Sequence, residues 1–343
     1  MISERIATLS ASAARSSGLA LRAATLCMAT VLPASAGIVK FDVHGSTATD
    51  PTAINAEGTI TGSYEDTSFA THGFVRSPDG TIKPFDASGA IATLPNAISG
   101  KDTIAGDYAD GSFTFHGFVR TAHGAITSFD PSGSILTAAT SVNDKDTVAG
   151  YFMDGSGVTH GFQRASDGTI TVFDPRDSTF TVSNAIDAKG TISGYFISSK
   201  DGAYHGFLRT PAGKYRTFSV SGAIVTESNT VNKTRATAGV YADSDGVYHS
   251  FARSPAGAIT TFDPTGAITS FASSMNDGGT IAGDFIDTNH VQHGFVRATD
   301  GTITSFDPKG STDTVAYGIN NSGTIAGHYV DSNNVDHGYV LTP

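Results

Sequence analysis

The sequence has almost no cysteine, no tryptophan and few charged side chains. Cys27 is its single cysteine, and Asp, Glu, Lys and Arg together make up 15% of the 343 residues. A fold held by disulfide bonds is therefore excluded, and stability must come from a hydrophobic core. Glycine is abundant instead, with 39 residues, which is typical of many short strands joined by tight turns.

Helical patterns and long apolar runs are also missing. After residue 36 no window keeps apolar residues at the spacing i, i+3, i+4 and i+7, so we expect no helix there. Before that point, three arginines precede a short apolar stretch, Ala23–Ala34, and Ala36 ends a run of small residues. This layout predicts a secretory signal peptide over residues 1–36, because the apolar stretch is too short to span a bilayer core of about 30 Å.

Charge is predominantly acidic. Cleavage after Ala36 lowers the basic residues from 21 to 18 and the acidic residues from 32 to 31. A chain this acidic is a poor partner for nucleic acid or for an anionic membrane surface. From the predicted signal peptide we expect a secreted or periplasmic protein with no membrane span, and we further expect it to be a monomer.

A fixed repeat runs through the remaining chain. The pentapeptide "HGFVR" and its variants begin at His72 and recur seven times, at steps of 44 or 45 residues. An "FD" or "FS" pair and a "GTIAG"-type segment each recur seven times at the same period. Such a period indicates a propeller or a solenoid, and solenoid coils are usually shorter.

Each repeat reads as four short strands, which we name a, b, c and d. In the first repeat these are Thr52–Ile54, Thr59–Tyr64, His72–Arg76 and Thr81–Asp86. Turns rich in Asn, Asp and Gly separate a from b and c from d. The predicted fold over residues 37–343 is therefore all-β, a seven-bladed β-propeller of four-stranded blades.

The two ends of the repeat array complement each other. The last repeat stops after strand c at Pro343, whereas Gly37–Asp42 reads as a strand d without a blade. We expect Gly37–Asp42 to pair with His337–Leu341, to complete blade seven and to close the ring. Closure protects sheet edges that would otherwise promote aggregation.

The repeated residues have predicted packing roles. Phe74 and its equivalents are expected to pack between adjacent blades, together with the Phe of each "FD" pair. Gly73 and its equivalents leave room for a close neighbour. The Arg that ends the motif, as at Arg76, is expected to face the rim, and Leu341 replaces it in the last blade.

The order I-N, G-T-I-x-G and H-G/A-F resembles the extracellular HAF repeat family of bacterial proteins. The segments "INAEGTITG…HGFVR" and "INNSGTIAG…HGYVL" carry the resemblance, which covers residues 38–343. It differs in one place, because Gly or Ser follows the His where the family has Ala. The resemblance implies a secreted bacterial propeller-like protein and implies no activity.

One aspartate per blade is a candidate ligand-binding residue, and blade four has Ser198 in its place. The motif His follows each aspartate by six residues, so the two side chains bracket the b–c loop. The aspartates are Asp66, Asp110, Asp154, Asp243, Asp287 and Asp331. They form either a ring of ligand or metal sites or, as repetition in every blade favours, loop caps that hydrogen-bond to the His. No cofactor is expected, although Asp243–Gly246 partly resembles a calcium loop and lacks its third Asp and its Glu.

Catalytic signatures are missing. The sequence contains no nucleophile elbow, no H-E-x-x-H and no phosphate loop. Blade five departs most from the repeat, either through one-off chemistry or through drift in a tolerant repeat. Its unusual residues are Ser219, Glu227, Lys233, Arg235 and Ser250.

Three functions remain open. The first is a binding module for an extracellular glycan, cell-wall polymer or protein, with its ligand on the face of the b–c and d–a connections. Those connections are expected to be the longer ones, and function tends to reside on longer loops. The second is a secreted lyase or hydrolase with a site over the central channel, and the third is a structural surface protein.

Overall fold

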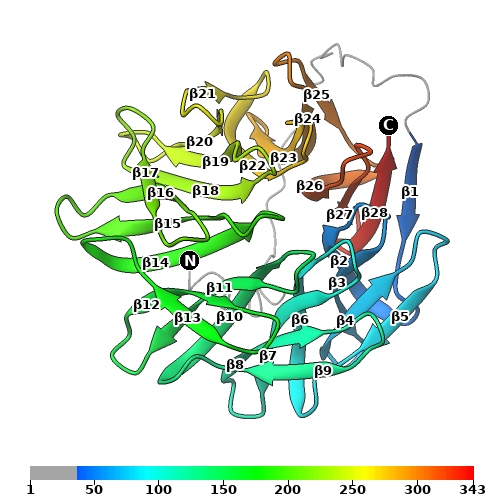
Figure 1. Cartoon of the computed structure of the whole chain (residues 1–343). Helices are drawn as coiled ribbons and strands as arrows, with labels where there is room; N and C mark the ends of the chain where they lie inside the picture. Colours follow the sequence, from blue (N-terminus) through cyan, green and yellow to red (C-terminus); the bar gives the residue numbers. More distant parts are fainter. Residues whose placement is uncertain (1–36) are drawn as a thin grey trace. The chain divides into compact units, whose positions relative to one another are not determined.

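A computed structural model describes residues 37–343. The predicted signal peptide over residues 1–36, with Cys27, lies outside these residues. The described chain forms 28 strands and no helix, and the strands group into antiparallel four-stranded blades (Figure 1). Residues 37–343 therefore include no helix that could cross a membrane.

Each blade contains one strand of every type. Strands a are β2 (Ser46–Ile54), β6 (Ala90–Ile98), β10 (Ser134–Val142), β14 (Ser178–Ile186), β18 (Val225–Val231), β22 (Ala267–Met275) and β26 (Ser311–Ile319). Strands b are β3 (Ile60–Asp66), β7 (Ile104–Asp110), β11 (Val148–Asp154), β15 (Ile192–Ser198), β19 (Thr237–Ala242), β23 (Ile281–Asp287) and β27 (Ile325–Asp331). Strands c are β4 (Thr71–Arg76), β8 (Phe115–Arg120), β12 (Thr159–Arg164), β16 (Tyr204–Arg209), β20 (Tyr248–Arg253), β24 (Gln292–Arg297) and β28 (Asp336–Thr342). Strands d are β5 (Ile82–Phe85), β9 (Ile126–Phe129), β13 (Ile170–Phe173), β17 (Tyr215–Phe218), β21 (Ile259–Phe262), β25 (Ile303–Phe306) and, for blade 7, β1 (Gly37–Phe41).

Strand a is longer than predicted. In blade 1 it covers Ser46–Ile54 rather than only Thr52–Ile54. Its pairing with β3 shifts register twice, between Ser46 and Ala48 and between Pro51 and Ala53. These bulges break the alternation of side chains, and a proline inside a strand is tolerated at such a bulge. The prediction failed because the broken alternation and the proline both argue against a strand.

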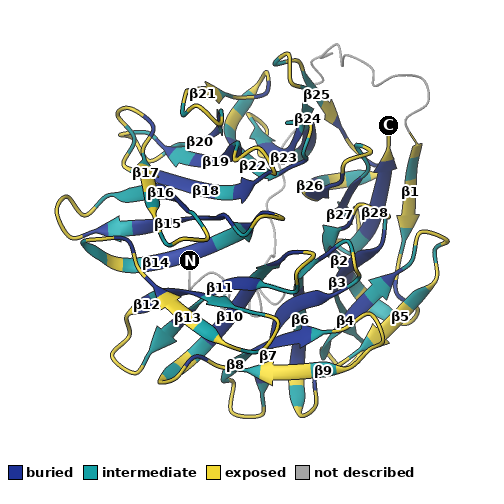
Figure 2. Ribbon diagram, in the orientation of Figure 1, coloured by how far each residue is buried: buried dark blue, intermediate teal, exposed yellow. Residues whose placement is uncertain are grey.

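Strands a are the innermost and strands d the outermost. Successive strands a contact one another all around the ring, including β2 with β26. Burial is greatest in the middle strands, such as β3 and β7, and lowest at the rim, where β5 and β9 have no fully buried residue (Figure 2). The core is therefore distributed between neighbouring blades.

An aromatic pair packs between each blade and the next, as predicted. Phe74 of β4 is fully buried and lies edge-on to Phe41 of β1, with 6.1 Å between ring centroids. The other pairs are Phe85–Phe118, Phe129–Phe162, Phe173–Phe207, Phe218–Phe251, Phe262–Phe295 and Phe306–Tyr339. The glycine prediction also holds, because a Cβ on Gly73 would lie 2.8 Å from Cζ of Phe85.

The motif arginines do not face the rim, so that prediction is wrong. The Arg76 guanidinium lies over the Phe41 ring at 4.7 Å, and the side chain is 9% exposed. Five further arginines stack in the same way on the preceding blade. The planar guanidinium can lie flat on an aromatic ring, so this side chain fills the gap between blades.

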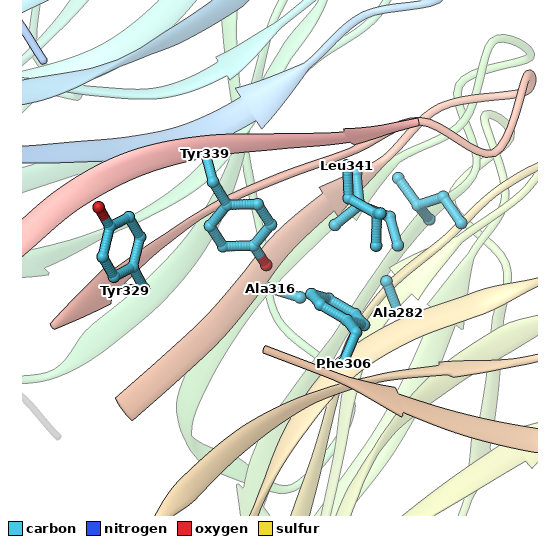
Figure 3. Close-up of a cluster of buried hydrophobic side chains, with 8 residues drawn as sticks. Ala282, Phe306, Ala316, Tyr329, Tyr339 and Leu341 are labelled. Atoms are coloured by element: carbon cyan, nitrogen blue, oxygen red, sulfur yellow. The ribbon is translucent and has the colours of Figure 1, made fainter. Parts of the chain in front are cut away.

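The predicted pairing between the two ends of the array is present. β1 pairs antiparallel with β28, from Gly37 opposite Thr342 to Phe41 opposite Gly338 (Figure 1). Side chains of β28 also pack against blade 6: Tyr339 and Leu341 share a buried cluster with Phe306 (Figure 3).

Blades 7 and 1 are also joined at their a–b turns. The Asn320 side-chain amide donates to the Asn55 carbonyl at 3.1 Å, across 265 residues of sequence. Within its own turn, Asn55 accepts from the Thr59 amide at 2.9 Å, and Gly58 adopts a positive φ of 87°. The predicted turn chemistry therefore also connects neighbouring blades.

Candidate functional site

In blade 1 the motif histidine lies between two carboxylates. Nδ1 of His72 is 2.9 Å from Asp86 Oδ2, and Nε2 is 3.4 Å from Asp66 Oδ2. Strands b and c and the end of strand d each contribute one residue, and Tyr64 stacks on the imidazole at 5.1 Å. We name this arrangement the Asp–His–Asp unit.

The unit recurs in every blade, with one variation. The regular copies are Asp110–His116–Asp130, Asp154–His160–Asp174, Asp243–His249–Asp263, Asp287–His293–Asp307 and Asp331–His337–Asp42. In blade 4, Ser219 takes the place of one aspartate, 2.6 Å from Nδ1 of His205. Asp201 takes the place of the other at 3.1 Å, which the sequence analysis missed although it is the only carboxylate in that b–c loop.

The aspartate at the end of strand b caps its loop. Oδ1 of Asp66 accepts from the amides of Ser68 and Ala70 at 2.7 and 3.0 Å, and also from the Ser68 hydroxyl. The Ser68 hydroxyl and these amides lower the pKa of Asp66 to about 2. Equivalent bonds from Ser156 and Val158 lower the pKa of Asp154 to about 2. The capping interpretation is confirmed, and ligand binding by these six aspartates stays a prediction.

The two carboxylates favour a protonated imidazole. Burial lowers the pKa of His72, but the hydrogen bonds and charges of Asp86 and Asp66 outweigh it and raise the pKa above its usual 6.5. A neutral imidazole can donate through only one nitrogen, whereas an imidazolium donates to both carboxylates. The pKa of His116, His160 and His249 is raised for the same reasons.

Metal binding finds no additional support in this geometry. Within residues 37–343, no group of three or more His, Asp or Glu side chains is placed to hold a metal ion. At the calcium-like segment, Asp243 accepts from the amides of Asp245 and Val247, as the other caps do. Calcium binding there stays a prediction.

The b–c and d–a connections share one face, but apart from the d–a connection at residues 219–224 they are not the longer ones. In blade 1 they cover residues 67–70 and 86–89, whereas the a–b and c–d turns cover 55–59 and 77–81. The prediction of length is wrong in most blades because strand a begins earlier than expected, separated from the "FD" pair by only three residues, and so shortens the d–a connection. We call the surface formed by the b–c and d–a connections the bc face.

Two phenylalanines at loop tips of the bc face were missed by the sequence analysis. Phe69 and Phe113 are 74% and 76% exposed and have φ values of 65° and 61°. Each follows a tight turn, in which the Phe69 amide donates to the Asp66 carbonyl at 3.0 Å. The other blades place Gly157, Gly202, Gly246, His290 and Asn334 at this position. Comparison of the seven repeats could have found the pair, because Phe stands there only in blades 1 and 2.

This backbone conformation is costly for phenylalanine. A left-handed conformation costs an L-residue roughly 1–2 kcal/mol, and Gly or Asn adopt it most readily. Phe69 and Phe113 also gain little burial in return, since about three quarters of each side chain is exposed. Outliers of this kind mark candidate functional positions.

A second group of unlike polar residues lies on inner strands between blades 7 and 1. Nδ1 of His328 is 3.4 Å from Oδ1 of Asp50, and the Tyr317 ring lies 5.6 Å from the imidazole. Burial raises the pKa of Asp50 above 3.8, with further increases from the charges of Asp336 and Glu65 and a decrease from His328. One blade earlier, burial raises the pKa of Asp284 to about 7, against the hydrogen bond from Gln292.

The structure does not bring the unusual residues of blade five together. Glu227 is buried on β18. Lys233 lies in the a–b turn, and its Nζ is 3.4 Å from Oδ2 of Asp277. Ser219 belongs to the unit of His205, and the Ser250 hydroxyl lies 2.8 Å from that of Ser270. These residues serve separate local contacts, so they form no single site.

Comparison with known sequences identifies no family. The chain matches no protein-family model and no curated protein sequence. Membership in the HAF repeat family therefore stays a prediction.

Solved structures do match. The β-propeller domain of the trilobed protease from Pyrococcus furiosus aligns with a TM-score of 0.64 at 9% identity, over 85% of this chain and 94% of that one. The BP39L lectin from Burkholderia pseudomallei aligns at 0.52 and 11% identity, over 87% and 98%.

TolB from Acinetobacter baumannii aligns at 0.52 and 15% identity, over 74% of this chain. The present chain spans 64% of the length of that protein. Identities this low establish the architecture alone, and with the seven repeated four-stranded blades they identify residues 37–343 as a β-propeller.

Proposed function

We propose that this propeller is an extracellular binding module, with its ligand on the bc face of blades 1 and 2. The observation that carries the proposal is the exposure of Phe69 and Phe113 in a strained backbone conformation. Exposed apolar side chains that give nothing to folding are typical of interaction sites. The ligand class is an extracellular glycan, cell-wall polymer or protein.

Arrays of glycans, cell-wall polymers and surface proteins test this proposal. The mature protein should bind at least one class, and the double variant F69N/F113N should lose that binding. Asn is chosen because Asn334 holds the same position in blade 7 at a φ of 63°. Binding that is equal in both proteins would place the ligand elsewhere.

Export from the cytoplasm is part of the same proposal. The basic, apolar and small-residue segments of residues 1–36 support it. Amino-terminal sequencing of the protein from periplasm and medium should give Gly37 as the first residue. A cytoplasmic protein that still begins at Met1 would contradict export.

A second candidate function is acid–base catalysis at the inner strands. It is favoured by the proximity of His328 to Asp50, beside Tyr317. Among the described strands a and b, His328 is the only histidine, as one-off chemistry requires. A screen of polysaccharide and ester substrates should reveal an activity that H328Q abolishes; an activity that H328Q retains, or none at all, argues against it.

A further inference from the structure

A third exposed apolar side chain lies between the two loops that carry Phe69 and Phe113, and we call the three an apolar row. A parallel bridge between Thr71 of β4 and Ala92 of β6 places the b–c loop of blade 1 beside the start of β6. Ala90 pairs with Asp110, the residue that precedes the b–c loop of blade 2. Ile91 therefore lies between the two loops, and it is 41% exposed.

The surroundings of this row are acidic. The four connections around it, residues 67–70, 86–89, 111–114 and 130–133, contain no Lys or Arg. Four carboxylates belong to them or directly precede them, namely Asp66, Asp86, Asp110 and Asp130. Each Asp–His–Asp unit holds two carboxylates for one imidazole, so it stays negative even when the histidine is protonated.

We infer that Phe69, Ile91 and Phe113, with the carboxylates around them, bind a polypeptide segment that carries Lys or Arg next to apolar side chains. The inference rests on the proposed function and names its ligand class. A cationic side chain gains from the face of an exposed aromatic ring and from nearby negative charge. Apolar side chains of the same segment cover the row, whereas phosphate-bearing polymers and anionic membranes are repelled.

Neutral glycans fit this surface less well. Oδ1 of Asp66 already accepts from Ser68 and Ala70, and Oδ2 faces His72. These oxygens are therefore committed to the loop and to the imidazole, while their charge still acts over several ångströms. Long-range charge selects a cation and gives a neutral sugar no advantage.

The probe is a short fluorescent peptide of alternating Lys and Leu, measured by anisotropy against the mature protein. Peptides of alternating Glu and Leu and of alternating Lys and Ser test the cationic and the apolar requirement separately. The Lys–Leu peptide should bind, the other two should bind at least about tenfold more weakly, and salt should weaken binding.

The variants come from residues that the protein itself uses at equivalent positions. F69N/F113N follows Asn334, and I91T follows Thr47 of blade 1. Both should weaken binding of the Lys–Leu peptide, by about tenfold or more for the double variant. The matched control I268T changes the equivalent isoleucine of blade 6, which is 40% exposed, and should leave binding unchanged. The melting temperature of F69N/F113N should be equal to or above that of the wild type, which separates lost binding from lost folding.

Three results would overturn the inference. Equal binding of the Lys–Leu peptide by F69N/F113N would do so, as would stronger binding of the Glu–Leu peptide. Binding to a neutral oligosaccharide or to anionic phosphatidylglycerol vesicles instead, lost in F69N/F113N, would reject the cationic polypeptide but retain the proposed function. If no ligand depends on these phenylalanines, both proposals fail.

Discussion

At the scale of single residues, the positions that are the same in every blade serve folding, whereas other positions differ between blades. Phe74, Gly73 and His72 occupy consecutive positions of strand c, and their equivalents make the same contacts in nearly every blade. A contact that a blade needs in order to fold is needed in all blades, which is why these residues recur. Functional residues are therefore expected among the exceptions, such as Phe69.

Asp66 should make stability depend on pH in the acid range. Its pKa is about 2 in the folded protein, against an ordinary 3.8. The stability it contributes is present above pH 3.8 and is lost as the pH falls towards 2. D66N keeps an oxygen for the loop amides and removes the titration. The variant should therefore be less stable than the wild type by the full amount at pH 5, and the difference in stability should become small at pH 2. Thermal melts across this pH range measure the difference in melting temperature. The control is E57Q, which changes an exposed carboxylate in a turn. An equal dependence of melting temperature on pH in D66N and wild type would contradict the prediction.

Arg253 should be replaceable by leucine. It is 4% exposed, its guanidinium stacks on Phe218 at 4.7 Å, and its Nε has no hydrogen-bond partner. Blade 7 has the apolar Leu341 at the same position, 3% exposed. Because burying a charge is costly, R253L should change the free energy of unfolding by less than about 1 kcal/mol or increase it. Chemical denaturation of R253L and of R253D, which buries an unpaired carboxylate, tests this. If R253L lost as much unfolding free energy as R253D, the cation itself would be required.

At the scale of strands and loops, the accuracy of prediction followed local regularity. Strands b and c and their turns could be predicted because apolar alternation and Asn or Gly turn residues agree there. Strand a could not, since two bulges and Pro51 interrupt its pattern. The stacking of Arg76 was missed because its partner, Phe41, belongs to another blade, and spacing along one repeat carries no information on that contact. The strain at Phe69 requires backbone geometry, although the comparison of repeats already marks its position.

An exchange between two b–c loops should test that strain. F69N in blade 1 should raise the free energy of unfolding by about 1 kcal/mol, and N334F in blade 7 should lower it by about the same amount. The physical reason is the left-handed backbone, with φ of 65° at Phe69 and 63° at Asn334. Urea denaturation of both variants provides the measurement. Opposite signs are expected, and a loss in both variants would mean that Phe69 stabilises its loop.

At the scale of the whole molecule, the first and last segments of the array meet in blade 7. β1 pairs with β28, Asp42 completes the unit of His337, and Asn320 bonds to Asn55. These contacts join residues 265 to 305 positions apart, so they bring together the two ends of the array. Loop-closure entropy is paid once for this joint and is offset by several contacts together.

Removal of the joining strand should therefore unfold the propeller. Deletion of Gly37–Val43, expressed behind residues 1–36, exposes the edge of β28 and removes Phe41 from beneath Phe74 and Arg76. Truncation of a fully buried Phe costs roughly 3–5 kcal/mol, and the total stability of a domain is about 5–15 kcal/mol. Phe41 is partly buried and contributes a share of that cost, to which the deletion adds the loss of all pairing between β1 and β28. The deletion protein should be aggregated or lack a cooperative melt.

The same strand moved to the other end of the chain should restore folding. Thr342 and Pro343 are equivalent to Ser77 and Pro78 of blade 1, where Asp and Gly follow and complete the c–d turn. A chain that lacks Gly37–Val43 and continues after Pro343 with Asp-Gly and a copy of Gly37–Asp42 should therefore offer β28 the same partner. In the intact protein, Ile38 already pairs with Leu341, as Ile82 pairs with Arg76 in blade 1, so the register is preserved. A cooperative melt in the moved-strand chain but not in the deletion chain is the expected result, whereas an unchanged melting temperature after deletion alone would show that β1 does not support the ring.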